Sequence, residues 1–177
     1  MLMFRPDGLQ EAQTADSVLM VRPVGFAFND ETAATNSFMR AAAAPDLTSR
    51  ALAEFEGLVR RLDDAGVHVT VLEEQREPDA LFPNNWVSFH ADGSMVLYPM
   101  AAVSRRAERA PERVRALLER CGYIVNDIVD LTEHESHGRY LEGTGSLVLD
   151  RAGRHAFASL GPRTDTRALA HFANWRN

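Results

Sequence analysis

The sequence predicts an α/β fold, because segments with the pattern of strands alternate with segments with the pattern of helices. One unit of this pattern recurs: residues 86–129 read as strand, tight turn, strand, helix and strand, and residues 146–177 begin the same order about 60 positions later. The matching positions are two turn pairs and two helix starts, Asp92-Gly93 with Ala152-Gly153, and Ser104 with Thr164. Since the chain stops within the second helix of the repeat, we expect it to be part of a larger protein.

Composition and charge narrow the class of protein. The chain has 177 residues, of which 45% are hydrophobic and 25% charged, enough for the core of one ordinary globular domain. A net charge of −6 argues against nucleic acid as a partner. No apolar run approaches the length of a membrane span, and the N-terminus lacks the apolar core of a secretory signal. Cys121 is the only cysteine, which excludes an internal disulfide, so we expect a soluble cytoplasmic protein with no membrane partner.

The first elements precede the repeat. Residues 1–16 are polar and are expected to be a loose N-terminus ahead of a single domain, residues 17–177. The apolar segment Ser17–Arg22 reads as a strand that Pro23 closes, and residues 24–45 read as a loop.

A helix and a strand follow this loop. The helix is predicted from about Thr48 to Ala65, and Gly66 can end it. Four apolar residues fall at helical spacing, namely Phe55, Leu58, Val59 and Leu62. Val67–Leu72 then alternates like a strand.

The first copy of the repeat begins with a hairpin. Trp86–His90 and Met95–Tyr98 flank the Asp-Gly pair that favours a tight turn. A helix is predicted from near Ser104 or Glu108 to Cys121, and since proline suits only the first helical turn, Pro111 places its true start nearby. Its predicted apolar stripe is Val114, Leu117, Leu118 and Cys121. Tyr123–Val129 reads as the returning strand.

The second copy repeats this order. Ser146–Leu149 and His155–Leu160 flank the second turn, and Thr164 can cap the helix that follows. The predicted buried face of this helix begins with Leu169, Phe172 and Ala173.

Five segments carry a resemblance to a known family. They are VRPVGFAFNDETAATN (21–36), FPNNWVSFH (82–90), LYPMAAVSRRAER (97–109), YLEGTGSLVLD (140–150) and GPRTD (161–165). Together they resemble the pentein superfamily of guanidine-modifying enzymes, which includes arginine deiminases, dimethylarginine hydrolases and amidinotransferases, and most of all its bacterial branch associated with citrulline use. The resemblance implies a five-bladed α/β propeller of ββαβ units around a central site, with about three blades in this chain.

The resemblance also implies a reaction. In the family a cysteine thiolate attacks the guanidinium carbon, an amine or ammonia leaves, and water releases the product, while a histidine moves protons. A planar cation with a fork of N–H donors needs paired acceptors at fixed angles, and the carboxylate of an amino-acid substrate needs arginine.

Four residues match the family's site. The resemblance implies that Glu142, before the glycine pair, grips the guanidinium, and that Asn85 stands where most relatives carry an aspartate that holds the distal nitrogens. It implies that Arg105 and Arg163, both at hairpin-to-helix junctions, bind the substrate carboxylate. The plainer alternatives are a glutamate in a glycine-rich turn, an asparagine in a turn before a strand, and arginines at solvated helix starts.

The neighbours of these residues have plainer roles. Gly143 and Gly145 would let the backbone approach a ligand closely, and a phosphate cradle is disfavoured because no helix is expected to begin there. We expect Arg106 and Glu108 to form structural ion pairs. A loop over the site is expected to hold Asn29, Glu31, Thr32 and Asn36.

The family's catalytic cysteine and histidine have no counterparts in this sequence. Cys121 is predicted to lie on the apolar stripe of a helix, at the helix end whose dipole disfavours a thiolate, and so to be unreactive. His134 and His137 form an H-x-x-H pattern, but no third ligand is evident and a polar loop is favoured over a metal site. His68 and His90 are expected to be structural, and His155 and His171 carry no signal. We therefore expect neither metal nor cofactor.

Two functions from different classes remain open. In the first, the chain is the substrate-gripping part of a hydrolase or amidinotransferase that acts on arginine or a related guanidino or ureido compound. In the second, it is a non-catalytic binding or assembly module, because uncovered strand edges can associate into homo-oligomers.

Overall fold

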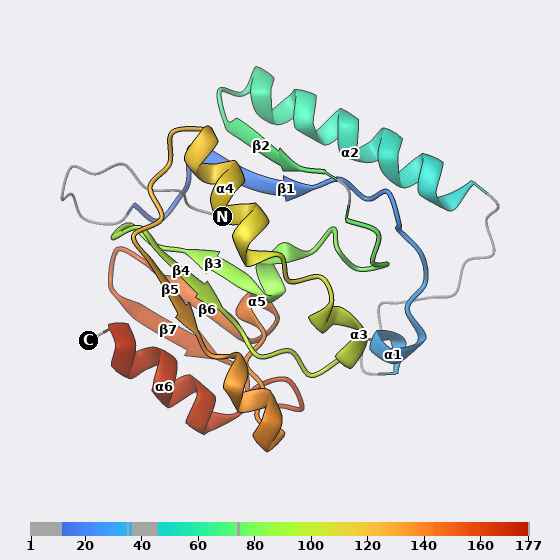
Figure 1. The fold of residues 1–177 in the computed structure, drawn as a ribbon. Helices are drawn as coiled ribbons and strands as arrows, with labels where there is room; N and C mark the ends of the chain where they lie inside the picture. Colours follow the sequence, from blue (N-terminus) through green and yellow to red (C-terminus); the bar gives the residue numbers. More distant parts are fainter. Residues whose placement is uncertain (1–11, 35, 37–45, 74, 177) are drawn as a thin grey trace.

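The predicted α/β fold is confirmed in a computed structural model that describes residues 12–34, 36, 46–73 and 75–176. The strands in this part of the chain form three small sheets, and helices cover their outer faces (Figure 1). Helices α2 and α6 lie on opposite sides of the molecule, with the sheets between them (Figure 1). No helix in the described ranges is long and apolar enough to cross a membrane.

The first sheet is a parallel pair joined by a helix. Strand β1 (Ser17–Val21) pairs in parallel with β2 (His68–Leu72), and α2 (Leu47–Asp64) connects them. The predicted loop between β1 and α2 also holds the single-turn helix α1 (Asp30–Ala33). Of the predicted stripe on α2, Phe55 is buried but Leu58 is 49% exposed, because this helix touches the sheet along a narrower face than its sequence suggested.

The second sheet is the first copy of the repeat. Strands β3 (Val87–Phe89) and β4 (Ser94–Leu97) form the predicted hairpin, and β5 (Asp127–Asp130) returns parallel to β4. Gly93 has φ +82°, which a tight turn with a glycine provides. The returning strand is shorter than predicted and starts at Asp127, because the residues before it run as irregular chain.

The predicted helix of this unit is two helices. A single turn, α3 (Val103–Arg106), is followed after a break by α4 (Pro111–Arg120), which begins at the proline as predicted. The break falls directly before Pro111, whose missing N–H and ring exclude it from a helix interior.

The third sheet is the second copy of the hairpin. Strands β6 (Leu147–Asp150) and β7 (His155–Ala158) are antiparallel, and α6 (Thr166–Arg176) follows. Positive φ falls on Arg154 at 56° and not on Gly153, so the two turns differ in conformation. The expectation that Thr164 caps α6 is wrong: Asp165 Oδ1 accepts the N–H of Arg167 at 2.8 Å and of Ala168 at 3.3 Å.

Strand β4 joins two hydrophobic cores, because its side chains alternate between the two faces of the sheet. Met95 and Leu97 pack with β1, β2, β3 and α4, whereas Val96 and the following Tyr98 pack with β6 and α6. All four residues of β4 are buried, which makes it the central strand of the molecule.

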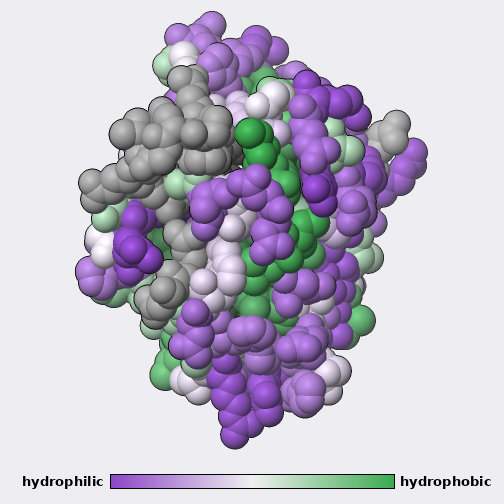
Figure 2. Space-filling view, turned by 60° about the vertical axis from the view of Figure 1, so that its left-hand side comes forward, coloured by the Kyte–Doolittle hydropathy of each residue, from purple (hydrophilic) through white to green (hydrophobic). Residues whose placement is uncertain are grey.

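The hairpin β6–β7 is much less covered. Val148 is 69% exposed, Phe157 63% and Leu160 67%, so one face of this hairpin presents large apolar side chains. Figure 2 shows that hydrophobic side chains gather in a band on one face of the molecule, bordered by hydrophilic ones.

Candidate functional site

A cavity of about 610 Å³ lies where several loops meet, and all four predicted site residues line it. Its walls come from the segment after β1, the start of α2, the turn before β3, the segment between β4 and α3, and the residues around α5 (Gly143–Ser146) and before α6. The polar and charged residues of its lining include Glu31, Thr32, Asp79, Asn85, Arg105, Glu142 and Arg163. Residues scattered over more than 130 positions in sequence therefore share one concave surface.

Glu142 is a buried carboxylate at the cavity wall, with 2% of the residue exposed. Its Oε1 accepts the backbone N–H of Ala101 at 2.9 Å, and its Oε2 accepts Nη1 of Arg163 at 3.1 Å. The backbone around it is fixed by Ser146, whose Oγ accepts the N–H of Glu142 and donates to the carbonyl of Arg163. The carboxylate that the sequence singled out is thus rigidly held and already carries one guanidinium.

The two glycines after Glu142 allow close packing with other parts of the site. A Cβ on Gly143 would lie 2.2 Å from the carbonyl oxygen of Asn84, and Gly143 has φ +20°. A Cβ on Gly145 would lie 2.8 Å from Nδ2 of Asn85 and 3.2 Å from Nη1 of Arg163. The expectation that no helix begins here is wrong, since the single turn α5 starts at Gly143. The lack of a side chain at both glycines therefore lets the backbone pack closely against other residues of the site.

Asn85 ends a short 3-10 helix, Pro83–Asn85, directly before β3. Its Oδ1 accepts Nη1 of Arg105 at 2.9 Å. The asparagine therefore closes a turn before a strand, as the plainer alternative expects, and it also lines the cavity.

Arg105 lines the cavity but is held on several sides by the protein. Its Nε and Nη2 donate to the two carboxylate oxygens of Glu108, both at 2.8 Å, and Nη2 also donates to the carbonyl of Phe82 at 3.1 Å. Arg105 is 5% exposed and Glu108 1%. Burial raises the pKa of Glu108, and the guanidinium of Arg105 opposes that rise.

Arg163 occupies the matching position in the second copy of the repeat and is much more open. Its side chain is 42% exposed, and its one side-chain hydrogen bond within the described residues goes to Glu142. A guanidinium that is this exposed and is held by one side-chain contact at the cavity edge can exchange partners at low cost, because water can compensate for the contact that it gives up.

Two acidic residues that the sequence did not single out as ligands also line the cavity. Asp79 is 6% exposed and accepts Nδ2 of Asn29 at 2.9 Å and Oγ1 of Thr32 at 3.0 Å, and its carboxylate lies 3.9 Å from Nε of Arg105. Asp79 sits in a charged loop with no periodic pattern, so no local signal distinguished it from its neighbours.

Glu31 closes the other side of the cavity. Its carboxylate accepts the backbone N–H groups of Val103 at 2.7 Å and Ser104 at 2.8 Å. Hydrogen bonds from the side chain and backbone of Ser104, and from the backbone of Val103, lower the pKa of Glu31. The loop 29–36, expected to cover the site, supplies Glu31, Thr32 and Asn36 to the lining.

The remaining sequence-predicted residues lie elsewhere. Arg106 and Glu108 do form ion pairs, Arg106 with Glu135 at 3.3 Å and Glu108 with Arg105. Cys121 is not among the residues that line the cavity, and it is exposed at the end of α4, so the expectation that it is buried on the apolar stripe is wrong. Among the histidines, His90 is buried and hydrogen-bonded to Ser88, as expected of a structural residue.

The sequence was compared with families, curated proteins and solved structures. A family model described as N,N dimethylarginine dimethylhydrolase, eukaryotic, matches residues 22–177. No curated protein sequence matches the chain.

Several solved structures share the fold. The N-terminal domain of ArgZ, an arginine dihydrolase from the ornithine-ammonia cycle in Cyanobacteria, matches with a TM-score of 0.66 at 19% identity, over 90% of this chain and 54% of that one. A dimethylarginine dimethylaminohydrolase matches with a TM-score of 0.61 at 17% identity, over 88% of this chain and 54% of that one. AgrE, in its complex with ornithine and NAD⁺, matches with a TM-score of 0.65 at 22% identity, over 91% of this chain and 22% of that one.

These likenesses support a mixed α/β fold similar to that of pentein enzymes, and this chain spans about half the length of the first structures it matches. The family match covers most of the sequence, and the matched family and the structural neighbours are all pentein proteins. The chain therefore belongs to the N,N-dimethylarginine dimethylhydrolase family, within the pentein superfamily.

Proposed function

We propose that residues 17–177 form the substrate-binding part of a pentein enzyme. This enzyme would act on arginine or a related guanidino or ureido compound, either by hydrolysing it or by transferring its amidino group. The observation that carries the proposal is the convergence of Glu142, Asn85 and Arg163 on one cavity, with the buried carboxylate of Glu142 holding a guanidinium at 3.1 Å. In this proposal the chain supplies about three of the five blades of the propeller.

The contact between Arg163 and Glu142 suggests how a substrate would enter. A substrate guanidinium offers the same planar donors as Arg163, so it can take the place of Nη1 of Arg163 on Oε2 of Glu142. Arg163, once released, would be free to pair with the carboxylate at the other end of an amino-acid substrate. Asp79 adds a second carboxylate to the same wall, and the amide of Asn85 adds a neutral hydrogen-bonding group.

Arg105 has a different role in this scheme. The resemblance assigns it to the substrate carboxylate, but its guanidinium already binds Glu108, Phe82 and Asn85. We therefore propose that Arg105 mainly orients the Asn85 amide, and that any contact with substrate uses the N–H of Nη1 that Asn85 does not take.

The attacking thiolate is proposed to lie outside these 177 residues. The family reaction needs a cysteine within reach of the guanidinium carbon, and the single cysteine of the sequence is not part of the cavity lining. On its own the chain is expected to bind guanidino compounds without converting them.

The test combines binding with turnover. We expect calorimetry to detect binding of arginine or dimethylarginine to the 177-residue chain, while assays for released ammonia, amine and citrulline stay at background. Glu142→Gln, which keeps an acceptor for Ala101 but removes the charge, is expected to weaken binding by roughly 10- to 100-fold. Glu112→Gln, on the exposed first turn of α4, is the matched control and should bind normally.

Two results would overturn the proposal. Equal binding by wild type and Glu142→Gln would show that the cavity carboxylate does not hold the ligand. Turnover that persists in Cys121→Ala but is lost in Glu142→Gln would show that the 177-residue chain carries a nucleophile other than Cys121.

A second function, assembly, is favoured by the hairpin β6–β7. Its exposed Val148 and Phe157 would be covered if a second chain packed on that face. Light scattering decides between the two functions, because a monomer over a wide concentration range would leave assembly without support.

A further inference from the structure

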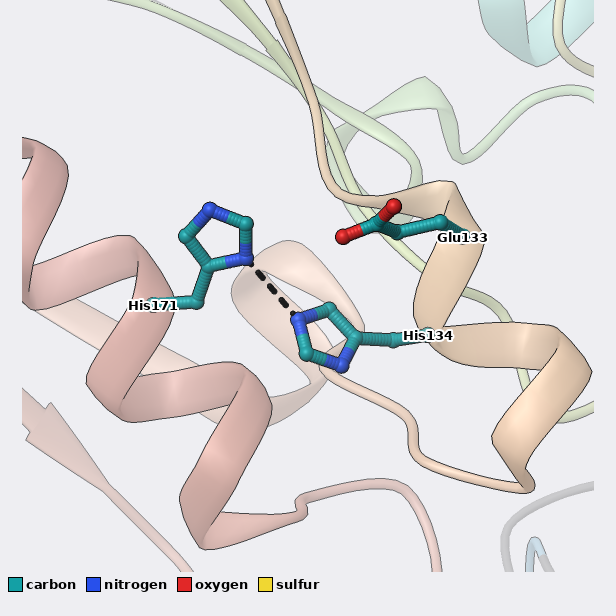
Figure 3. A group of neighbouring side chains, drawn as sticks. All are labelled: Glu133, His134 and His171. Atoms are coloured by element: carbon teal, nitrogen blue, oxygen red, sulfur yellow. Dashed lines mark hydrogen bonds between the residues drawn. The ribbon is translucent and has the colours of Figure 1, made fainter.

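A cluster of two imidazoles and a carboxylate lies outside the cavity, between the 3-10 helix Thr132–His137 and α6. It consists of Glu133 and His134 from the first element and His171 from the second. One ligand atom from each residue lies within 4.8 Å of the other two. Figure 3 shows the two rings facing one another and the carboxylate turned toward the gap between them.

We propose that Glu133, His134 and His171 form a binding site for a divalent transition-metal ion of the Zn²⁺ class, which would link the 3-10 helix to α6. This site differs from the H-x-x-H pair that the sequence suggested, because the second imidazole comes from α6, 37 residues away, and not from His137.

The ligand types suit such an ion. Imidazole nitrogens and a carboxylate oxygen are the donors that Zn²⁺ takes when three ligands come from protein and a fourth position is left to water. Mg²⁺ and Ca²⁺ prefer all-oxygen sites, so two imidazoles select against them.

The spacing of the nitrogens is close to what one ion requires. His134 Nε2 lies 3.0 Å from His171 Nδ1. Two nitrogens bound to one tetrahedral zinc at about 2.05 Å would lie about 3.3 Å apart, so the rings need to separate by only a few tenths of an ångström. Glu133 and His171 are both exposed and can make this adjustment, while buried His134 provides the fixed ligand.

The protonation state needed for binding is accessible. In the hydrogen-bonded pair one of the two facing nitrogens carries a proton, and binding requires that proton to move to the other nitrogen of the same ring, with no change in charge.

Binding of an ion would link two elements that adjoin cavity-lining segments. Glu135, on the same 3-10 helix, accepts the N–H of Met100 at 2.8 Å and pairs with Arg106, and these two residues lie on either side of Arg105 in the sequence. Helix α6 begins three residues after Arg163. A metal at this site is therefore expected to act as a structural brace.

The experiment uses the full chain without a histidine tag, stripped of metal and carrying Cys121→Ser so that the exposed thiol cannot contribute a ligand. Calorimetry with Zn²⁺ measures affinity and stoichiometry, Co²⁺ reports coordination through its visible absorption, and thermal unfolding reports stabilisation by binding to the native state. We expect one ion per chain and a rise in Tm with Zn²⁺.

Variants at exposed positions keep the test independent of folding. His171→Ala is expected to weaken Zn²⁺ binding by at least about 10- to 100-fold, since even partners outside the first ligand shell cost that much, and to remove the rise in Tm. Glu133→Gln should weaken binding in the same direction. His137→Ala, on the same 3-10 helix and also exposed, is the matched control and should bind as wild type does.

Three results would overturn the proposal: no Zn²⁺ binding by the parent chain at micromolar concentrations, unchanged binding in His171→Ala, or binding lost in His137→Ala. Absence of Zn²⁺ binding by the parent chain would mean that the two histidines form a hydrogen-bonded packing contact only.

Discussion

The two hairpin-and-helix units, residues 86–130 and 146–176, share an order of elements but are held in place differently. In the first unit β5 completes the sheet, and the N–H groups at the start of α3 bind Glu31, more than 70 residues earlier in the chain. In the second unit no third strand pairs with the hairpin within the described residues. Asp165, the residue directly before the following helix, caps that helix. The first helical turn after the hairpin is therefore bound by a distant residue in the first unit, whereas the helix of the second unit is capped by its own neighbour.

The difference is sharpest at the two equivalent arginines. Arg105 is buried in a double contact with Glu108, whereas Arg163 is 42% exposed, and in the described part of the chain Glu142 is the one hydrogen-bond partner of its side chain. The same position in a repeat thus gives one arginine that belongs to the protein's own structure and one that is available to a ligand.

Removing Arg105 should cost the most stability. Arg105→Ala leaves the carboxylate of Glu108 buried without its cation, which typically costs about 3–5 kcal/mol of unfolding free energy. Because burial raises the pKa of Glu108, protonation neutralises the orphaned charge as the pH falls, and the cost should shrink in mildly acidic solution. Urea unfolding at neutral and mildly acidic pH measures both effects.

The matched control for this measurement is Arg163→Ala. Its partner Glu142 keeps the N–H of Ala101, so we expect a smaller loss, on the order of 1–3 kcal/mol. Equal losses for the two arginines would mean that the division between a structural and an available arginine is wrong.

Ligand binding, in contrast to stability, should depend strongly on Arg163. If Arg163 pairs with the substrate carboxylate as proposed, Arg163→Ala should weaken arginine binding by roughly 10- to 100-fold, the usual worth of a hydrogen bond to a charged group. Arg167→Ala, at an exposed position on α6, is the control of the same residue type. A ligand without a carboxylate, such as methylguanidine, should bind wild type and Arg163→Ala alike, and a difference between them would argue against this role.

The two hairpin turns provide a smaller test of the same comparison. Gly93 has φ +82°, and a Cβ there would lie 2.6 Å from Nδ2 of Asn126, so Gly93→Ala should cost about 1–2 kcal/mol. At Gly153 φ is not positive, and the nearest atom to an added Cβ is Oδ2 of Asp150, at the end of a side chain that can move. Gly153→Ala should therefore cost less than about 1 kcal/mol, as judged by thermal unfolding. Equal costs would show that the turns are equivalent after all.

Local patterns in the sequence predicted the elements that local physics determines. The Asp92-Gly93 turn, the start of α4 at Pro111 and the strand β4 follow from residue types at short spacing, and the structure confirms them. The exposed end of α4 at Cys121 was not predicted, because burial depends on what packs against a helix and not on its own periodicity.

Side chains that act through distant partners were the hardest to predict. Asp79 lies in a loop with no periodic pattern, and His171 is not on the predicted buried face of its helix; only the fold brings Asp79 to the cavity and His171 to His134. By contrast, the motifs around Glu142, Asn85, Arg105 and Arg163 singled out four residues that the fold places around one cavity. Their roles as ligands remain proposals, because motif matching locates residues and does not measure what they bind.

The smallest predicted effect concerns the long-range contact of Glu31 with the start of α3 in the first unit. The pKa of Glu31 is lowered from 4.5 by its hydrogen bonds to Ser104 and Val103. A lowered pKa in the folded state means that this carboxylate stabilises the structure above pH 4.5 and that its contribution is lost as the pH falls through the lower folded value. The backbone amide resonances of Val103 and Ser104 should therefore shift in acid with a midpoint below 4.5, and Glu31→Gln should abolish the shift. A midpoint at or above 4.5 would show that the carboxylate gains nothing from these amides.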